Sequence, residues 1–129
     1  MATLTTALTV TSTDNTTDVL QLSVTDSLTT AEHTVQIART TVSVVGASNI
    51  IQPDTSGATY YLYVKHTGTS DGSAATTENL GVELTGDVIV GKLSVGEWMF
   101  MPVGGHSLGV QLQSSTGTIN AEYAYWTKG

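Results

Sequence analysis

Apolar and polar residues alternate along most of this chain, so that hydrophobic side chains recur at every second position. Near the start, Leu8 and Val10 share one parity with threonine between them, and Leu20, Leu22 and Val24 repeat the pattern. This period of two is typical of a strand with one buried face. No window of the sequence shows the 3.6-residue period of an amphipathic helix. The pattern therefore predicts an all-β protein.

The later part of the chain continues the alternation and adds frequent turn residues. Further alternating segments lie around Val35 and Ile37, Val42 and Val44, Tyr61–Val64, Leu80–Leu84, Val88 and Val90, Trp98 and Phe100, Leu108–Leu112, and Ile119–Tyr125. Glycine-containing turns separate most of them, as short antiparallel strands require. About eight to ten strands at this spacing predict an antiparallel sandwich or barrel. Of the two, we expect a β-sandwich of jelly-roll-like character.

Composition changes near residue 46. Residues 1–45 hold 14 of the 24 threonines and contain no glycine, proline or aromatic residue, whereas all 13 glycines fall at Gly46 or later. A length of 129 residues suits one domain overall. We therefore expect threonine-rich strands over 1–45 and a sandwich core over 46–129. Two interpretations of 1–45 stay open: the first strands of the same sandwich, or an arm suited to pairing with another chain.

Charge excludes several classes of partner. Four basic residues face eleven acidic ones, for a formal net charge of -7. So few Lys and Arg side chains cannot replace the counterions of a nucleic acid or hold an anionic membrane. The apolar runs are too short to span a bilayer, and the first residues lack the basic start of a secretion signal. We expect a protein made in a cytoplasm that stays in solution.

The chain offers little material for catalysis or metal binding. It has no cysteine, no nucleophile elbow and no phosphate-binding loop. The histidines, His33, His66 and His106, are far apart in sequence, and we interpret them as surface or turn residues. Asp14, Asn15 and Asp18 could supply oxygen ligands to calcium, but a polar turn explains them better. We therefore expect no catalytic residue, no metal and no cofactor.

The aromatic residues are the candidate interaction residues. All eight lie between positions 60 and 126: Tyr60, Tyr61, Tyr63, Trp98, Phe100, Tyr123, Tyr125 and Trp126. Neighbouring residues of a strand point to opposite faces, so Tyr60 and Tyr61 cannot both lie in one core, nor can Tyr125 and Trp126. Because Tyr and Trp are enriched at interfaces, we expect a core plus a subunit interface. A sugar-stacking platform is the alternative.

Three segments resemble small β-sandwich virion proteins of tailed bacteriophages. The segment 60–68 resembles an aromatic strand that ends in a turn, with His66 where that turn commonly has Asn. The segment 93–102 is similar to their central Gly-Glu turn, aromatic strand and proline, and 120–126 is similar to their closing strand. The resemblance covers about the last 70 residues, and residues 1–45 share only its threonine-rich style.

The resemblance implies a non-enzymatic structural protein of the virion, synthesised in the bacterial host cytoplasm. We expect a capsid decoration, or cement, protein that forms a homotrimer and contacts virion proteins such as the major capsid protein. A neck or tail fibre component, or a glycan-binding module that recognises a host surface, are the alternatives. A small hydrolase is a third and weaker hypothesis, because no acidic pair stands in a recognisable setting.

Overall fold

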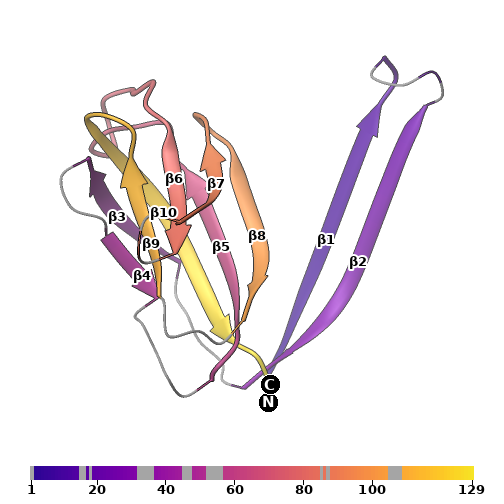
Figure 1. Cartoon of the computed structure of the whole chain (residues 1–129). Coiled ribbons are helices and arrows are strands. Elements are labelled where there is room, and N and C mark those ends of the chain that lie inside the picture. The colour runs from indigo at the N-terminus through magenta and orange to yellow at the C-terminus, as the bar shows by residue number, and fades with distance from the viewer. Residues whose placement is uncertain are drawn as a thin grey trace. The chain divides into compact units, whose positions relative to one another are not determined.

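The chain divides into two compact units, which we describe separately. The protein is described from a computed structural model that defines residues 2–14, 17, 19–31, 37–44, 48–51, 57–84, 86, 88–104 and 109–129. The first unit spans residues 1–33 together with 128–129, and the second spans 34–127. Both units consist of antiparallel strands, so the protein is all-β as the alternation predicts (Figure 1).

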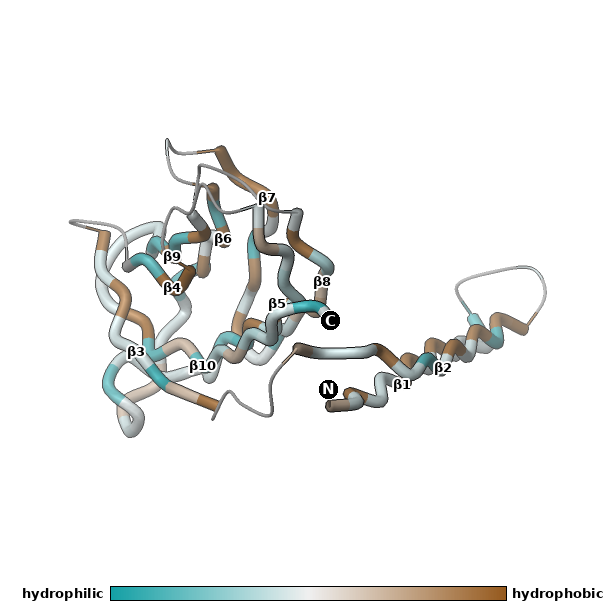
Figure 2. Tube along the Cα trace, turned by 90° about the horizontal axis from the view of Figure 1, so that it is seen from below, coloured by the Kyte–Doolittle hydropathy of each residue, from teal (hydrophilic) through white to brown (hydrophobic). Residues whose placement is uncertain are grey.

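The first unit is a two-stranded hairpin. β1 (Ala2–Ser12) and β2 (Leu20–Thr30) pair over their whole length, from Ala2 opposite Thr30 to Ser12 opposite Leu20. Apolar and polar segments alternate along both strands in Figure 2. At the open end of the hairpin, Thr30 forms a β-bridge with Lys128, and the N–H of Gly129 donates to the carbonyl oxygen of Thr29. The last residues of the chain therefore fasten this end.

The second unit is a β-sandwich of two four-stranded sheets. Its strands are β3 (Ala38–Ser43), β4 (Ser48–Ile51), β5 (Tyr60–His66), β6 (Leu80–Leu84), β7 (Val88–Leu93), β8 (Trp98–Val103), β9 (Val110–Ser114) and β10 (Thr118–Thr127). One sheet has the order β3-β10-β5-β8 and the other β4-β9-β6-β7. Most consecutive strands change sheets. Two packed antiparallel sheets confirm the predicted β-sandwich, and its jelly-roll character stays a prediction.

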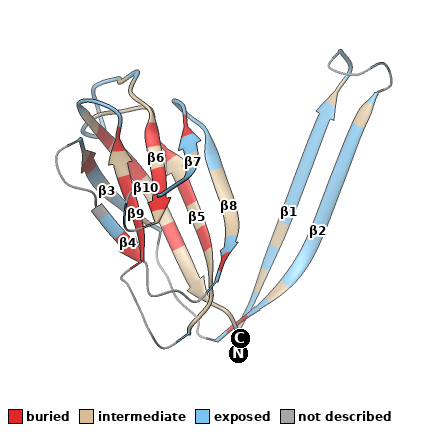
Figure 3. Ribbon diagram, viewed as in Figure 1, coloured by how far each residue is buried: buried red, intermediate tan, exposed pale blue. Residues whose placement is uncertain are grey.

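Aliphatic side chains from both sheets form the core of the sandwich. Leu62 of β5, Leu80 of β6 and Leu112 of β9 are completely buried. Ile119 of β10 and Val42 of β3 join them in one cluster. Figure 3 shows this burial along the strands of the sandwich, whereas most of β1 and β2 is exposed. The alternation of the sequence thus becomes an inner apolar and an outer polar or aromatic face on each sheet.

The threonine-rich first segment is shared between the two units. β1 and β2 form the hairpin, but β3 pairs with β10 inside the sandwich, from Ala38 opposite Tyr123 to Ser43 opposite Thr118. The boundary between the two units along the chain therefore falls between residues 33 and 34, not at the compositional change near residue 46. β3 is therefore a strand of the sandwich, whereas pairing of residues 1–33 with another chain stays a prediction.

His66 closes β5 through its side chain. The residue is completely buried, its Nδ1 accepts the N–H of Gly68 at 2.9 Å, and its Nε2 lies 2.8 Å from the carbonyl oxygen of Glu78. A carbonyl can only accept, so the neutral ring carries its proton on Nε2. Gly68 has a φ of 83°, which a glycine adopts without strain. An Asn side chain makes the same bond to the residue two positions on, so His66 can replace the expected Asn.

We predict that His66→Leu lowers the free energy of unfolding by about 2–4 kcal/mol, because it leaves two backbone groups without a partner beside the core. His66→Asn keeps an acceptor for Gly68, and His66→Gln keeps a donor for Glu78, so each should lose less than the leucine variant. Urea unfolding of the full chain followed by circular dichroism measures the differences. Equal stability of the leucine variant and the wild type would contradict this role of His66.

Candidate functional site

Five of the eight aromatic residues lie on the outer face of the sheet β3-β10-β5-β8. Residues directly opposite each other in an antiparallel pair share a face of the sheet. Tyr61 of β5 lies between Pro102 of β8 and Trp126 of β10 in this register, and Tyr63 lies between Phe100 and Ala124. Trp98 of β8 is opposite Lys65 in the next row. We call Tyr61, Tyr63, Trp98, Phe100 and Trp126 together the aromatic face.

Three rings of the aromatic face are in contact. The rings of Tyr61 and Phe100 are stacked with centroids 6.0 Å apart and an angle of 14° between their planes. The ring of Phe100 is 6.5 Å from that of Trp126 at an angle of 43°. These distances are typical of favourable ring pairs. Phe100 is thus the centre of a continuous apolar platform.

A small residue on β10 leaves space beside these rings. Ala124, which is opposite Tyr63, carries only a methyl group, so large rings on the neighbouring strands can come together above β10. It is completely buried but does not belong to the core cluster between the sheets. Trp98 is 53% exposed, which leaves most of its ring in contact with solvent. An exposed indole next to packed rings can bind a partner without unfolding the sheet.

Charged side chains border the aromatic face on one side. Glu122 of β10 lies between Lys65 of β5 and Arg39 of β3. Its Oε2 is 3.3 Å from the Arg39 guanidinium, and its Oε1 accepts the hydroxyl proton of Tyr63 at 3.1 Å. Burial raises the pKa of Tyr63, and the hydrogen bond to Glu122 and its charge raise it further. Two of the chain's four basic residues therefore lie on this sheet face, although the whole chain has a net charge of -7.

The other three aromatic residues pack against the core. Tyr60, Tyr123 and Tyr125 contact the buried aliphatic cluster. The rings of Tyr60 and Tyr125 meet edge to face with centroids 5.8 Å apart. The pairs Tyr60–Tyr61 and Tyr125–Trp126 are therefore divided between the inside and the outside, as strand geometry requires.

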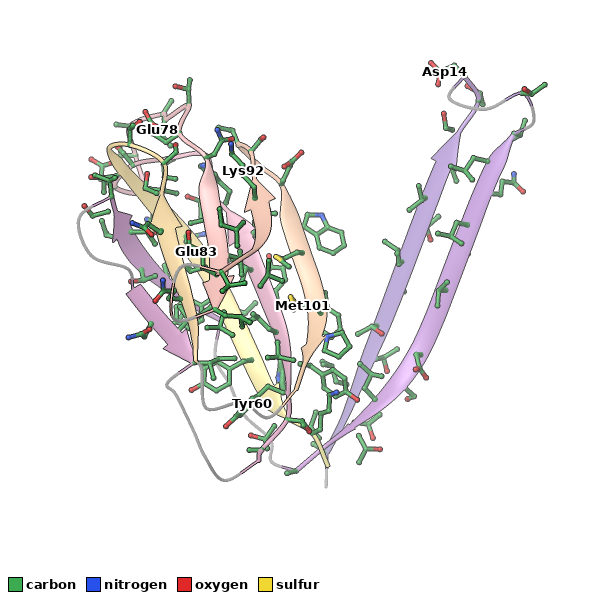
Figure 4. All side chains as sticks on the ribbon, viewed as in Figure 1. Asp14, Tyr60, Glu78, Glu83, Lys92 and Met101 are labelled. Carbon is green, nitrogen blue, oxygen red and sulfur yellow. The ribbon has the colours of Figure 1, made fainter. Side chains whose placement is uncertain are left out.

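The outer face of the second sheet carries a hollow that the sequence did not suggest. Its volume is about 180 Å³, and its lining includes Gly81, Glu83, Lys92 and Gln113; Figure 4 labels Glu83 and Lys92. Glu83 is only 7% exposed, and its Oε2 accepts a hydrogen bond from the Gln111 side chain at 3.0 Å. Gly81 creates the hollow, because a Cβ there would lie 3.2 Å from Glu83 Oε1. Only the register, which places Gly81 between Lys92 and Gln113, could have revealed this site.

The remaining candidates from the sequence form no site in the described chain. His33, His106, Asn15 and Asp18 lie outside the described residues, and Asp14 accepts a hydrogen bond from Ser12 in the β1–β2 connection (Figure 4). Among the residues that the structure defines, no group of three His, Asp or Glu side chains could hold a metal ion. In the same residues, no helix is long and apolar enough to cross a membrane.

No protein-family model, curated protein or solved structure matches the chain. The resemblance to small virion proteins therefore depends on the three sequence segments named above and stays a prediction. Any function must therefore be inferred from the geometry of the two outer sheet faces and of the hairpin.

We predict that Glu122→Gln lowers the pKa of Tyr63 toward its ordinary value of about 10. Part of the increase should remain, because burial is its largest cause. The raised pKa also means that the unfolded chain loses this proton first, so stability should fall as the pH rises above about 10. Tyrosinate absorbance during an alkaline titration measures the pKa, with Tyr63→Phe identifying the signal of this residue. An unchanged or raised pKa in the glutamine variant would contradict the role of Glu122.

Proposed function

We propose that this protein is a non-enzymatic structural protein of a bacteriophage virion, a decoration protein that binds the capsid shell through its aromatic face. The observation that carries the proposal is the platform of Tyr61, Phe100 and Trp126 on the outside of a rigid sheet. Soluble proteins rarely expose large apolar rings in one continuous patch unless that patch binds something.

The composition of the aromatic face favours a protein partner. Tyr, Trp and Arg are the residues that most often dominate binding energy at protein interfaces, with apolar rings at the centre and charges at the rim. Here Phe100 is central, while Arg39 and Glu122 lie at the border. This arrangement suits a partner with an apolar centre and polar groups at the rim.

The virion setting comes from the sequence resemblance. A decoration protein needs no catalytic centre, since it stabilises a shell by contact. Each copy would hold neighbouring shell subunits, and many modest contacts add up on one particle. Because the chain carries a net charge of -7 and no cysteine, it suits high local concentration in a bacterial cytoplasm and on a particle. A neck or tail fibre position would use the same face.

Glycan recognition is the second candidate, and the stacked pair Tyr61–Phe100 together with the exposed ring of Trp98 favours it. Flat rings can lie against the apolar face of a sugar, and Lys65 and Glu122 could bind its hydroxyl groups. Titration of a broad glycan panel, followed by tryptophan fluorescence, separates the two functions. Quenching that disappears in Trp98→Ala would favour recognition of a host surface over shell binding.

We predict that Phe100→Ala weakens binding to the capsid shell at least tenfold, the effect typical of a central hot-spot residue. Shells from phage that lack this gene are mixed with purified protein, and bound protein is measured by co-sedimentation. Val88→Ala is the matched control, because Val88 is 52% exposed on β7 of the other sheet. If wild-type protein fails to bind the shells, or if the Phe100 variant binds equally well, the proposal is wrong.

A further inference from the structure

Two rows of side chains build the hollow on the outer face of the sheet β4-β9-β6-β7. In the first row, Gly81 of β6 lies between Lys92 of β7 and Gln113 of β9. In the second row, Glu83 of β6 lies opposite Ile89 of β7. Because Gly81 and Glu83 are two residues apart on one strand, they share a face of the sheet. The glycine therefore leaves open a space that the neighbouring carboxylate borders.

Glu83 presents a buried carboxylate to this space. The residue is only 7% exposed, and its Oε2 accepts one hydrogen bond, from Gln111 Nε2 at 3.0 Å. Its Oε1 lies over Gly81, 3.2 Å from the point where a Cβ would be. Among the residues that the structure describes, no basic side chain forms an ion pair with this carboxylate. A buried carboxylate is costly unless a cation or several donors satisfy it, so Glu83 favours a positively charged group in the hollow.

Lys92 borders the same space and changes the kind of ligand that fits (Figure 4). The register shift beside Val90 brings Ile89 and Lys92, three residues apart, to one side of the sheet. Lys92 is exposed, and within the described part of the chain it forms no ion pair. Its charge repels a simple cation and attracts an anionic group. A ligand for this hollow therefore needs an ammonium group toward Glu83 and a carboxylate toward Lys92.

The distance between the two residues suits charges that lie close together in the ligand. Glu83 and Lys92 are diagonal neighbours across β6 and β7, and the Cβ atoms of such neighbours are about 7–8 Å apart. The ammonium and carboxylate groups of an α-amino acid are attached to one carbon atom. Together with one ion-pair contact at each end, they span a distance of this order.

The size of the hollow and its aliphatic wall limit the rest of the ligand. The volume is about 180 Å³, and a cavity of roughly 150 Å³ is large enough for benzene. Ile89 lines the hollow with an exposed aliphatic side chain. A side chain of a few carbon atoms can lie against Ile89 while the charged groups of the ligand meet Glu83 and Lys92.

We propose that the hollow over Gly81 binds a small zwitterion, an α-amino acid with a short aliphatic side chain. Its ammonium group contacts Glu83, and its carboxylate lies beside Lys92. Gly81 admits the ligand, because a side chain at this position would occupy the space above the strand. The inference does not depend on the proposed function, since the site lies on the other sheet and uses no residue of the aromatic face.

Three probes of similar size test the two charges. L-valine carries both charged groups, isobutylamine lacks the carboxylate, and isovalerate lacks the ammonium group. In ¹H–¹⁵N correlation spectra of the full-length protein, L-valine should shift the amide signals of Gly81 and Lys92 and saturate with a Kd of about 1 mM or tighter. The other two probes should bind at least about tenfold more weakly. The inference is overturned if L-valine gives no saturable shifts at these residues, or if either single-charge probe or O-phosphoethanolamine binds as tightly.

Substitution of each charged residue should change the preference among the probes. Lys92→Met removes the charge from an exposed side chain, so this variant should bind L-valine no better than isobutylamine. Glu83→Gln keeps the size of the buried side chain and an acceptor for its hydrogen bond, so it should bind L-valine no better than isovalerate. Asp26→Asn removes an exposed carboxylate from the hairpin and is the matched control, with the Kd of the wild type. A wild-type preference in the folded Lys92→Met protein would by itself contradict the proposal.

A methyl group at position 81 tests the space. The Cβ of Gly81→Ala would lie 3.2 Å from Glu83 Oε1 and 3.3 Å from the carbonyl oxygen of Gln113, so it should weaken binding of L-valine at least about tenfold. Gly104→Ala adds the same methyl group in open space and should keep the affinity of the wild type. Urea unfolding checks that both variants are folded. Equal affinity of the two folded variants for L-valine would rule out a site over Gly81.

Discussion

The strict alternation of side chains along a β-strand is the constraint on which the whole protein depends. In a regular strand, a residue that points into the core places both of its neighbours on the outer face. At the irregularity in β4, the adjacent Ile50 and Ile51 are both buried. On β5, Leu62 and Val64 are completely buried, and the residues between and beside them must therefore face the outside. The buried half of the pattern stabilises the sandwich, and the other half supplies every surface that could bind a partner.

The same constraint gives the two units different surfaces. On the sandwich, the outward positions of β5, β8 and β10 carry Tyr61, Phe100 and Trp126. The inward positions there pack against the second sheet, so the outward rings are not part of the core cluster. The hairpin is a two-stranded sheet in the described residues, and its Leu8, Leu22 and Val24 side chains are exposed. The sandwich thus buries its apolar side chains between two sheets, whereas the paired strands of the hairpin form a single layer.

Much of the fold could be predicted from the sequence, because the alternation of apolar and polar residues is a local property. The all-β class follows from it, and so does the division of Tyr60 from Tyr61 between the two sides of a strand. The strand order could not be predicted, because the pairing of β3 with β10 joins residues about 80 positions apart. The contact of Phe100 with Trp126 and the hollow above Gly81 depend on that order. The sequence indicated the turn at His66 but not its burial, because the bond of its Nε2 to the Glu78 carbonyl depends on the path of the β5–β6 connection.

The excess of threonine is explained by the demands of exposed sheets. Threonine has the β-branched shape that strands favour, yet its hydroxyl group keeps a solvated face from attracting other sheets. On the hairpin, most residues of the face opposite the leucines are threonine or serine. The ribbon therefore has one largely apolar side and one polar side. Leucine at every position would make both sides apolar, and such hairpins would stack into aggregates of unlimited size. The threonine-rich composition thus confines the large apolar side chains of the hairpin to one face.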